Sequence, residues 1–289
     1  MTIGTCIRLT HLTEDLQRAV DLVFDTVELY ANDTLRGADL RALWPRMREI
    51  IGDAGITVSG IGLYGNPLVC EETRRDLRRC IEAAPALGCG FVGTFAGALP
   101  GRCVPEAIPA FRDCFSELTR VAEDCGVRIG LENAPMNGHW YSATCNLAFQ
   151  PRAWELLFDA VPSDRLGLEW EPSHQVEQLI DPLPQLKTWL PRVFHLHGKD
   201  AAIDWPRVRR EGIWFGTHYC DHRFPGLGDT DWCALLRVLR DGGWQGDIAV
   251  EGFHDPVYRD DRETEGQAMA LRHLREALRT IEETGEVQP

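Results

Sequence analysis

Short apolar runs rich in β-branched residues alternate with longer amphipathic segments along almost the whole chain. The apolar runs predict strands at residues 3–9, 25–29, 56–63, 91–95, 127–131, 166–170, 193–196 and 247–250. The amphipathic segments predict helices that begin near Thr13 and at 40–51, 71–87, 105–125, 152–160, 183–190, 232–240 and 263–283. Eight strand–helix units without a linker favour a closed α/β barrel, the (β/α)8 TIM barrel, over an open sheet with fewer units.

The length agrees with that prediction. The chain has 289 residues, and a (β/α)8 barrel typically takes ~250. No G-x-G-x-x-G follows the first predicted strand, and no low-complexity segment divides the chain. We therefore expect a single TIM barrel domain over residues 1–289. Residues 201–228 form a long predicted loop rich in Gly, Trp, His and Arg, and loops of that length in compact domains tend to be functional.

The charge and cysteine content restrict the partners. Thirty basic residues stand against forty-four acidic ones, a net charge of −14 that disfavours nucleic acid and anionic membrane surfaces. No run approaches ~18 apolar residues, and the start of the chain lacks the basic region of an export signal. The ten cysteines are scattered without a C-x-x-C pair, which argues against a structural zinc site. The sequence therefore predicts a reduced, cytoplasmic protein that binds neither nucleic acid nor membrane.

Acidic and imidazole side chains follow four successive predicted strands. In a TIM barrel the active site lies at the C-terminal ends of the strands, so these side chains would share one rim. They occur in the segments Gly130–Leu131–Glu132–Asn133, Glu169–Trp170–Glu171–Pro172–Ser173–His174, His195–Leu196–His197–Gly198–Lys199–Asp200 and Val250–Glu251–Gly252.

Each segment alone also has an ordinary structural interpretation. A single Glu132 fits a solvated loop, the His195-x-His197 pair fits core histidines on one strand face, and Glu171-x-x-His174 fits the start of a helix. The acids could also merely solvate the barrel mouth. The coincidence of four strands favours a metal site.

The segments GLENA, EPSH, HLHGKD, GLGDTDW and IAVEGF occur in that order. Together they resemble the xylose-isomerase-like sugar phosphate isomerase/epimerase superfamily, most clearly between residues 127 and 251. The resemblance implies a (β/α)8 barrel with one divalent metal, often manganese. Carried over residue by residue, it implies the metal ligands Glu132, Glu171, His197 and Glu251. It also places His174 and Lys199 at positions that contact substrate oxygens.

One ligand departs from the family pattern. Glu171 stands where the family usually has Asp, which moves the carboxylate by ~1.5 Å at most. Glu169 lies two residues earlier on the same strand face and is the alternative ligand. The spacing to His174 favours Glu171.

Three carboxylates and one imidazole make a hard, oxygen-rich set. Such a set suits Mn²⁺ or Mg²⁺ better than a metal that prefers thiolates, and the resemblance favours Mn²⁺, with Mg²⁺, Co²⁺ or Zn²⁺ as alternatives. A divalent ion that chelates a ketone and its neighbouring hydroxyl acidifies the C–H between them and stabilises an enediolate. By resemblance to ketose epimerases, Glu132 and Glu251 are the expected catalytic acid/base pair.

Other residues near the strand ends are candidates for substrate contact. Lys199 is one of only two lysines, which suggests a chemical role, with an ion pair to Asp200 or another barrel acid as the alternative. His222 and Arg223 follow in a loop that resembles a superfamily loop, and they are either substrate contacts or simple loop residues. Trp140, like Trp170 and Trp214, could stack on a sugar or could pack hydrophobically.

The leading functional prediction is a metal-dependent isomerase or epimerase acting on a keto sugar or sugar derivative through an enediolate. The first alternative is a lyase on the same scaffold, which would dehydrate a keto-polyol or cleave a 3-keto-glycoside by β-elimination. An endonuclease-IV-like nuclease is disfavoured by the −14 charge and by Cys220, where that branch has an acid. A non-catalytic sugar-binding barrel would lack a ligand, whereas all four are present. The expected partner is a small carbohydrate, and formation of a homo-oligomer is left open.

Overall fold

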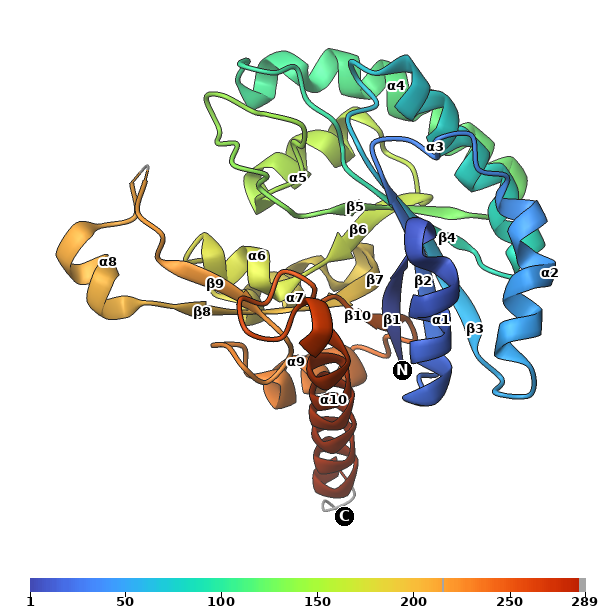
Figure 1. Ribbon diagram of the computed structural model, residues 1–289. Helices are drawn as coiled ribbons and strands as arrows, with labels where there is room; N and C mark the ends of the chain where they lie inside the picture. Colours follow the sequence, from blue (N-terminus) through green and yellow to red (C-terminus); the bar gives the residue numbers. More distant parts are fainter. Residues whose placement is uncertain (215, 286–289) are drawn as a thin grey trace.

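Eight parallel strands close into a barrel in this computed structural model, which describes residues 1–214 and 216–285 (Figure 1). The strand order around the barrel is β1-β10-β7-β6-β5-β4-β3-β2. The strands are β1 (Thr2–Arg8), β2 (Thr26–Asn32), β3 (Thr57–Tyr64), β4 (Phe91–Thr94), β5 (Arg128–Glu132), β6 (Leu166–Trp170), β7 (Val193–Gly198) and β10 (Asp247–Val250). The predicted (β/α)8 class is confirmed, and each predicted strand corresponds to one barrel strand.

Helices cover the outside of the barrel (Figure 1). They are α1 (Leu12–Asp21), α2 (Leu40–Ile51), α3 (Glu71–Ala83), α4 (Val104–Cys125), α5 (Pro151–Ala160), α6 (Pro172–Glu177), α7 (Pro182–Trp189), α9 (Trp232–Asp241) and α10 (Glu263–Gly285). Four 3₁₀ turns, η1 (Leu9–His11), η2 (Ala84–Leu87), η3 (Leu190–Arg192) and η4 (Asp260–Arg262), extend or join them. Their apolar faces bury large side chains such as Phe111, Phe115, Trp154 and Trp232 against the strands, which keeps the barrel closed.

The segment predicted as a long loop, 201–228, contains regular structure. Strands β8 (Asp200–Ile203) and β9 (Cys220–Arg223) pair antiparallel, and α8 (Trp205–Glu211) lies between them. In Figure 1 this hairpin projects away from the barrel. The loop prediction was wrong here because the segment has no long apolar run, and its strands are held by pairing with each other.

Two further observations bear on the sequence predictions. All ten cysteines are free thiols. Within residues 1–214 and 216–285, no helix combines the length and the apolar character needed to cross a membrane.

Candidate metal centre and active site

The C-terminal ends of β5, β6, β7 and β10 bring the predicted site residues together. Glu132, His197, Lys199 and Glu251 line a cavity of about 290 Å³ at this end of the barrel. Glu171 lies just beneath the cavity wall and is fully buried. The alternation of side chains along each strand explains the arrangement, because every second residue points into the barrel.

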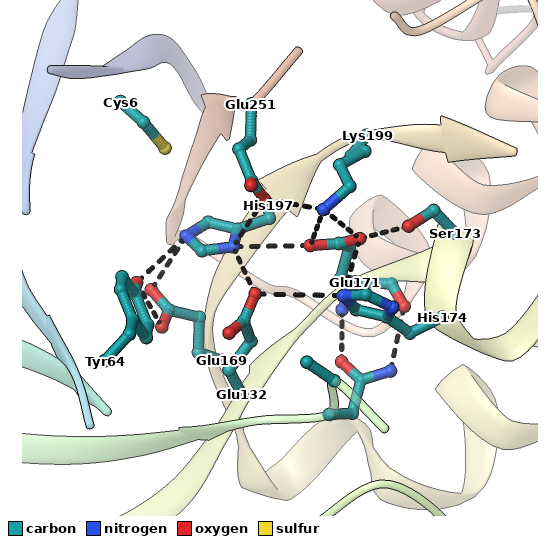
Figure 2. A network of polar contacts seen from close by, with 12 residues as sticks. Cys6, Tyr64, Glu132, Glu169, Glu171, Ser173, His174, His197, Lys199 and Glu251 are labelled. Atoms are coloured by element: carbon teal, nitrogen blue, oxygen red, sulfur yellow. Dashed lines mark hydrogen bonds and ion pairs between the residues drawn. The ribbon is translucent and has the colours of Figure 1, made fainter. Parts of the chain in front are cut away.

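Three carboxylates face one nitrogen of His197. From His197 Nδ1, the nearest oxygens of Glu132, Glu171 and Glu251 lie at 3.3, 3.5 and 3.5 Å (Figure 2). One donor atom from each of these four residues lies within 4.8 Å of all the others. We call Glu132, Glu171, Glu251 and the Nδ1 side of His197 the upper cluster.

Lys199 joins the upper cluster from above. Its Nζ lies 3.2 Å from Glu171 Oε1 and donates a hydrogen bond of 3.1 Å to Glu251 Oε2. The Ser173 hydroxyl also donates to Glu171 Oε1. The lysine therefore pairs with barrel acids, whereas Asp200 accepts hydrogen bonds from Gly226 N, Thr230 N and Trp232 Nε1.

A second group of cavity residues surrounds His174. His174 Nε2 lies 3.2 Å from Glu171 Oε1, and Nδ1 lies 3.2 Å from Glu177 Oε2. His222 Nδ1 lies 3.2 Å from the Ser173 hydroxyl, and its Nε2 lies 3.7 Å from Glu177. His174, Glu177 and His222 all line the cavity. Glu177 was not predicted, and its only sequence signal is its i+3 spacing from His174.

The pKa of Glu132 shifts in the opposite direction from those of the other two acids of the upper cluster. Burial raises the pKa of Glu132 to about 7, against the opposing effect of His197. Burial also raises the pKa of Glu251, but the Lys199 ammonium and the contact with His254 together outweigh it and lower that pKa to about 2. For Glu171, burial is likewise outweighed by His174 and Lys199, so its pKa lies well below the usual range.

The upper cluster fits a divalent cation. Its three carboxylates converge on one imidazole nitrogen, and in this arrangement they are neutralised only by His197, His174, Lys199 and His254 among the described residues. Carboxylate oxygens with one imidazole are a usual ligand set for hard divalent ions. The other imidazole nitrogen, Nε2, lies 3.0 Å from Glu28 Oε2, as is typical for the outer partner of a metal-bound histidine.

Two predicted substrate contacts lie elsewhere. Arg223 Nε donates to Asp255 Oδ2 at 2.8 Å, and Arg223 does not line the cavity formed by the described residues. Trp140 packs partly buried against the core with the Arg152 guanidinium 3.9 Å above its ring, and it too is absent from the cavity wall. Both are held by structural contacts that sequence spacing does not reveal. Trp170 is completely buried in the core.

Aromatic side chains form the opposite wall of the cavity. Tyr30, Tyr64, Phe95 and Phe253 line it, from the ends of β2, β3, β4 and β10. Tyr30 and Phe253 stack with centroids 5.4 Å apart. The cavity is thus lined by both charged groups and aromatic rings, a mixed lining that is usual for small-molecule sites.

Sequence reasoning missed a second cluster below the first. Glu28, Glu169, His195 and the Nε2 side of His197, here called the lower cluster, also bring their donor atoms within 4.8 Å of one another. Tyr64 lies against it, and Figure 2 shows Tyr64 and Glu169 on one side of the His197 ring with Glu171 and Lys199 on the other. Glu169 was the alternative ligand for the upper cluster, and the structure places it in the lower one. The sequence feature that could have indicated this cluster is Glu28, an acid that lies between Val27 and Leu29 inside a predicted strand.

Sequence relatives of the chain are named as enzymes. The inosose dehydratase of Klebsiella pneumoniae subsp. pneumoniae is 27% identical over 190 residues, which cover 60% of each chain. The rhizopine catabolism protein MocC of Rhizobium meliloti is 31% identical over 100 residues, covering 34% of this chain and 31% of that one. The matches thus span 60% or less of these two relatives' lengths.

Solved structures share the whole fold. The probable 3-DHS dehydratase AsbF of Bacillus anthracis has a TM-score of 0.69 at 14% identity, covering 95% of this chain and 99% of that one. An L-ribulose 3-epimerase has a TM-score of 0.71 at 16% identity, covering 100% and 99%. The model of one family, the xylose isomerase-like TIM barrel, matches residues 16–279. The chain belongs to the xylose isomerase-like TIM barrel family.

Proposed function

We propose that this chain is a metal-dependent lyase that removes water from a keto-polyol or keto sugar. The observation that carries the proposal is the arrangement of two groups on the same cavity, the imidazole of His174 and the carboxylate of Glu132, which pairs with no lysine or arginine among the described residues. Elimination needs one base and one acid, whereas epimerisation needs two groups that exchange protons with opposite faces of one carbon.

Glu132 is the base in this proposal. Its side chain contacts His197 at 3.3 Å and lies 4.0 Å from His174. Glu251, by contrast, is held by Lys199 at 3.1 Å and by His254 at 3.3 Å. A carboxylate paired with an ammonium group is a weaker base than one whose neighbours are imidazoles, so Glu132 takes the proton from the carbon next to the carbonyl.

The divalent ion, when bound by the upper cluster, would polarise the carbonyl and stabilise the enolate. Lys199 donates to the same developing negative charge from the cavity side. His174, which Glu177 holds through Nδ1, gives its proton to the departing hydroxyl as the C=C bond forms. One proton leaves carbon, one joins the hydroxyl, and water departs, so the steps balance.

The named relatives support the same chemistry. Inosose dehydratases are among the sequence relatives and a probable 3-DHS dehydratase is among the structural ones. The order of the two sequence-based hypotheses is thus reversed, with the lyase now first. Mn²⁺ remains the proposed ion because the upper cluster is mainly oxygen.

Epimerisation is the second candidate, and one observation favours it. Glu132 and Glu251 reach the same cavity from β5 and from the end of β10, as the original acid/base prediction requires. Epimerases are also among the structural neighbours. A substrate held between the two acids would show one face to each.

Mass spectrometry and NMR of the Mn²⁺-loaded protein with inososes and keto sugars separate these proposals. The lyase predicts a product lighter by one water with a new conjugated C=C bond. A stereoisomer of unchanged mass would support the epimerase, and no reaction of the metal-loaded protein with any α-hydroxyketone would contradict both. Glu132→Gln is expected to form product much more slowly, and Glu155→Gln, on the exposed face of α5, is the matched control.

A further inference from the structure

The lower cluster is a set of ionisable side chains sealed inside the barrel. Glu28 and Glu169 are completely buried, and His195 and His197 are at most 2% exposed. Burying two carboxylates costs several kcal/mol each unless cations compensate them, so such a group needs an explanation. In the described part of the chain no lysine or arginine pairs with either acid, and the two histidines are their only basic partners.

The backbone is shaped to place these two acids. The parallel pairing shifts register between Val27 and Glu28 and again between Leu168 and Glu169. Such irregularities re-aim the side chain that follows them. On the facing strands, a Cβ at Gly62 would lie 2.7 Å from Glu28 Oε1, and one at Gly93 would lie 2.2 Å from Glu169 Oε2. A larger residue at Gly62 or Gly93 would therefore take up space that these carboxylates occupy.

The hydrogen bonds of the cluster are incomplete. Tyr64 has one hydroxyl hydrogen, and it faces Glu28 Oε1 at 2.7 Å and Glu169 Oε2 at 2.8 Å. Glu169 Oε1 and His195 Nδ1 lie 3.2 Å apart, yet neither makes a hydrogen bond, and both atoms are buried. His195 Nε2 lies 3.3 Å from the Ser59 hydroxyl, which orients the ring so that Nδ1 points at the two acids. Buried polar atoms that lie close together without a hydrogen bond call for an explanation, and a bound ion is one.

We infer that the lower cluster is a second divalent cation site, of the kind that binds Zn²⁺. Its donors are two imidazole nitrogens and two carboxylate oxygens, a set that zinc commonly takes. In a tetrahedral site with ligands at about 2.0–2.2 Å, neighbouring ligand atoms lie roughly 3.3–3.6 Å apart. Here the four N–O separations are 3.0, 3.2, 3.2 and 3.7 Å.

His197 links the two sites. Its Nδ1 belongs to the upper cluster and its Nε2 to the lower one. When both are occupied, His197 binds through both nitrogens and gives up its ring protons as an imidazolate. Glu28, Glu169 and His195 are buried and do not line the cavity formed by the described residues, so the role of the lower ion is to fix the His197 ring and not to meet substrate.

The test is zinc stoichiometry and position in the full chain. Apo-protein reconstituted with Zn²⁺ alone should hold about two ions, because each set of four ligands makes one site. Crystals of that protein should show anomalous peaks in both clusters at the zinc edge. At saturating Zn²⁺, Glu28→Gln with Glu169→Gln should remove the lower ion while the upper one persists, and Glu171→Gln with Glu251→Gln should remove the upper ion while the lower one persists. Glu117→Gln with Glu155→Gln, both exposed, is the matched control.

The crystal of the unsubstituted protein keeps the test valid if a variant fails to fold. An anomalous peak in the upper cluster alone would overturn this inference and leave the proposed function standing. A peak in the lower cluster alone would support the inference and contradict the proposed metal-dependent function. A stoichiometry of about one that Glu28→Gln with Glu169→Gln does not change would also overturn the inference, because one set of four ligands accounts for one ion.

Discussion

The two sides of the His197 ring differ in what they can reach. The upper cluster borders a cavity of about 290 Å³, and Lys199, Ser173 and His174 contact its carboxylates. The lower cluster has nearly the same kinds of ligand, but the barrel and Tyr64 enclose it. The same residue types therefore support catalysis only where a substrate can enter. The two clusters therefore differ more in whether a substrate can reach them than in the identity of their ligands.

The change with the largest expected effect is His197→Ala, because His197 belongs to both clusters. Loss of this ring should remove metal from the upper cluster and lower turnover by about 10⁴-fold or more, since both the ion and the acid/base geometry are lost. Elemental analysis and steady-state rates measure the two effects. His11→Ala, on an exposed 3₁₀ turn, is the control. Full metal content and turnover in His197→Ala would contradict the shared role.

Glu132→Gln should act only on the upper cluster. We expect turnover to fall by about 10²–10⁴-fold, the usual contribution of a general base, while the lower cluster and the fold persist. The substitution is nearly isosteric, so circular dichroism should be unchanged. If Glu132→Gln loses less than a factor of about ten, a range below that of general acid–base groups, Glu132 is not the base.

Lys199→Met separates electrostatic stabilisation from metal binding. Turnover should drop by about a hundredfold, as for loss of one oxyanion donor, while Mn²⁺ content stays intact. Lys187→Met is the matched control, because Lys187 is the other lysine and lies exposed on α7. Loss of metal together with activity would instead assign Lys199 to holding Glu171 and Glu251 in place.

Glu169→Gln changes the lower cluster while keeping its shape. Because Glu169 lies 3.2 Å from His197 Nε2, its loss should weaken Mn²⁺ binding in the upper cluster by about 10–100-fold, the typical effect of an outer partner. At saturating Mn²⁺ the turnover should recover. If turnover stays low at saturating Mn²⁺, Glu169 takes part in the reaction itself and does not act only through His197.

The smallest effect is expected from Tyr64→Phe. The hydroxyl contacts Glu28 and Glu169, and its loss should lower the free energy of unfolding by about 1–3 kcal/mol, the cost of leaving buried acceptors unpaired. Turnover should stay within a few-fold. Chemical denaturation with a rate assay tests both, and an unchanged unfolding free energy would show that the lower carboxylates do not depend on this contact.

The barrel and the upper cluster could be predicted from the sequence because both follow local rules. Apolar runs define strands, and residues just after strands meet at one end of a TIM barrel. Thus Glu132, Glu171, His197 and Glu251 converge as expected. The preference for Glu171 over Glu169 followed from its spacing to His174, and Glu171 indeed lies 3.2 Å from His174 Nε2. Glu169 instead lies 3.2 Å from His197 Nε2, in the lower cluster.

The rest depended on contacts between distant residues. Glu28 meets His197 across 169 positions, and a register shift that no local pattern announces turns it inward. Arg223 instead donates a hydrogen bond to Asp255, 32 residues later in the chain. The hairpin of β8 and β9 is stabilised by its own pairing, and its two four-residue strands are too short to form a long apolar run.

Deuterium NMR of the reaction tests the central claim most directly. The Mn²⁺-loaded protein would be incubated in heavy water with an inosose or a related keto-polyol. The account predicts loss of the hydrogen on the carbon next to the carbonyl, dependent on Glu132, with release of water and formation of a C=C bond. Turnover in which every C–H bond next to the carbonyl survives would contradict it, and a hydrolase would then be the better description.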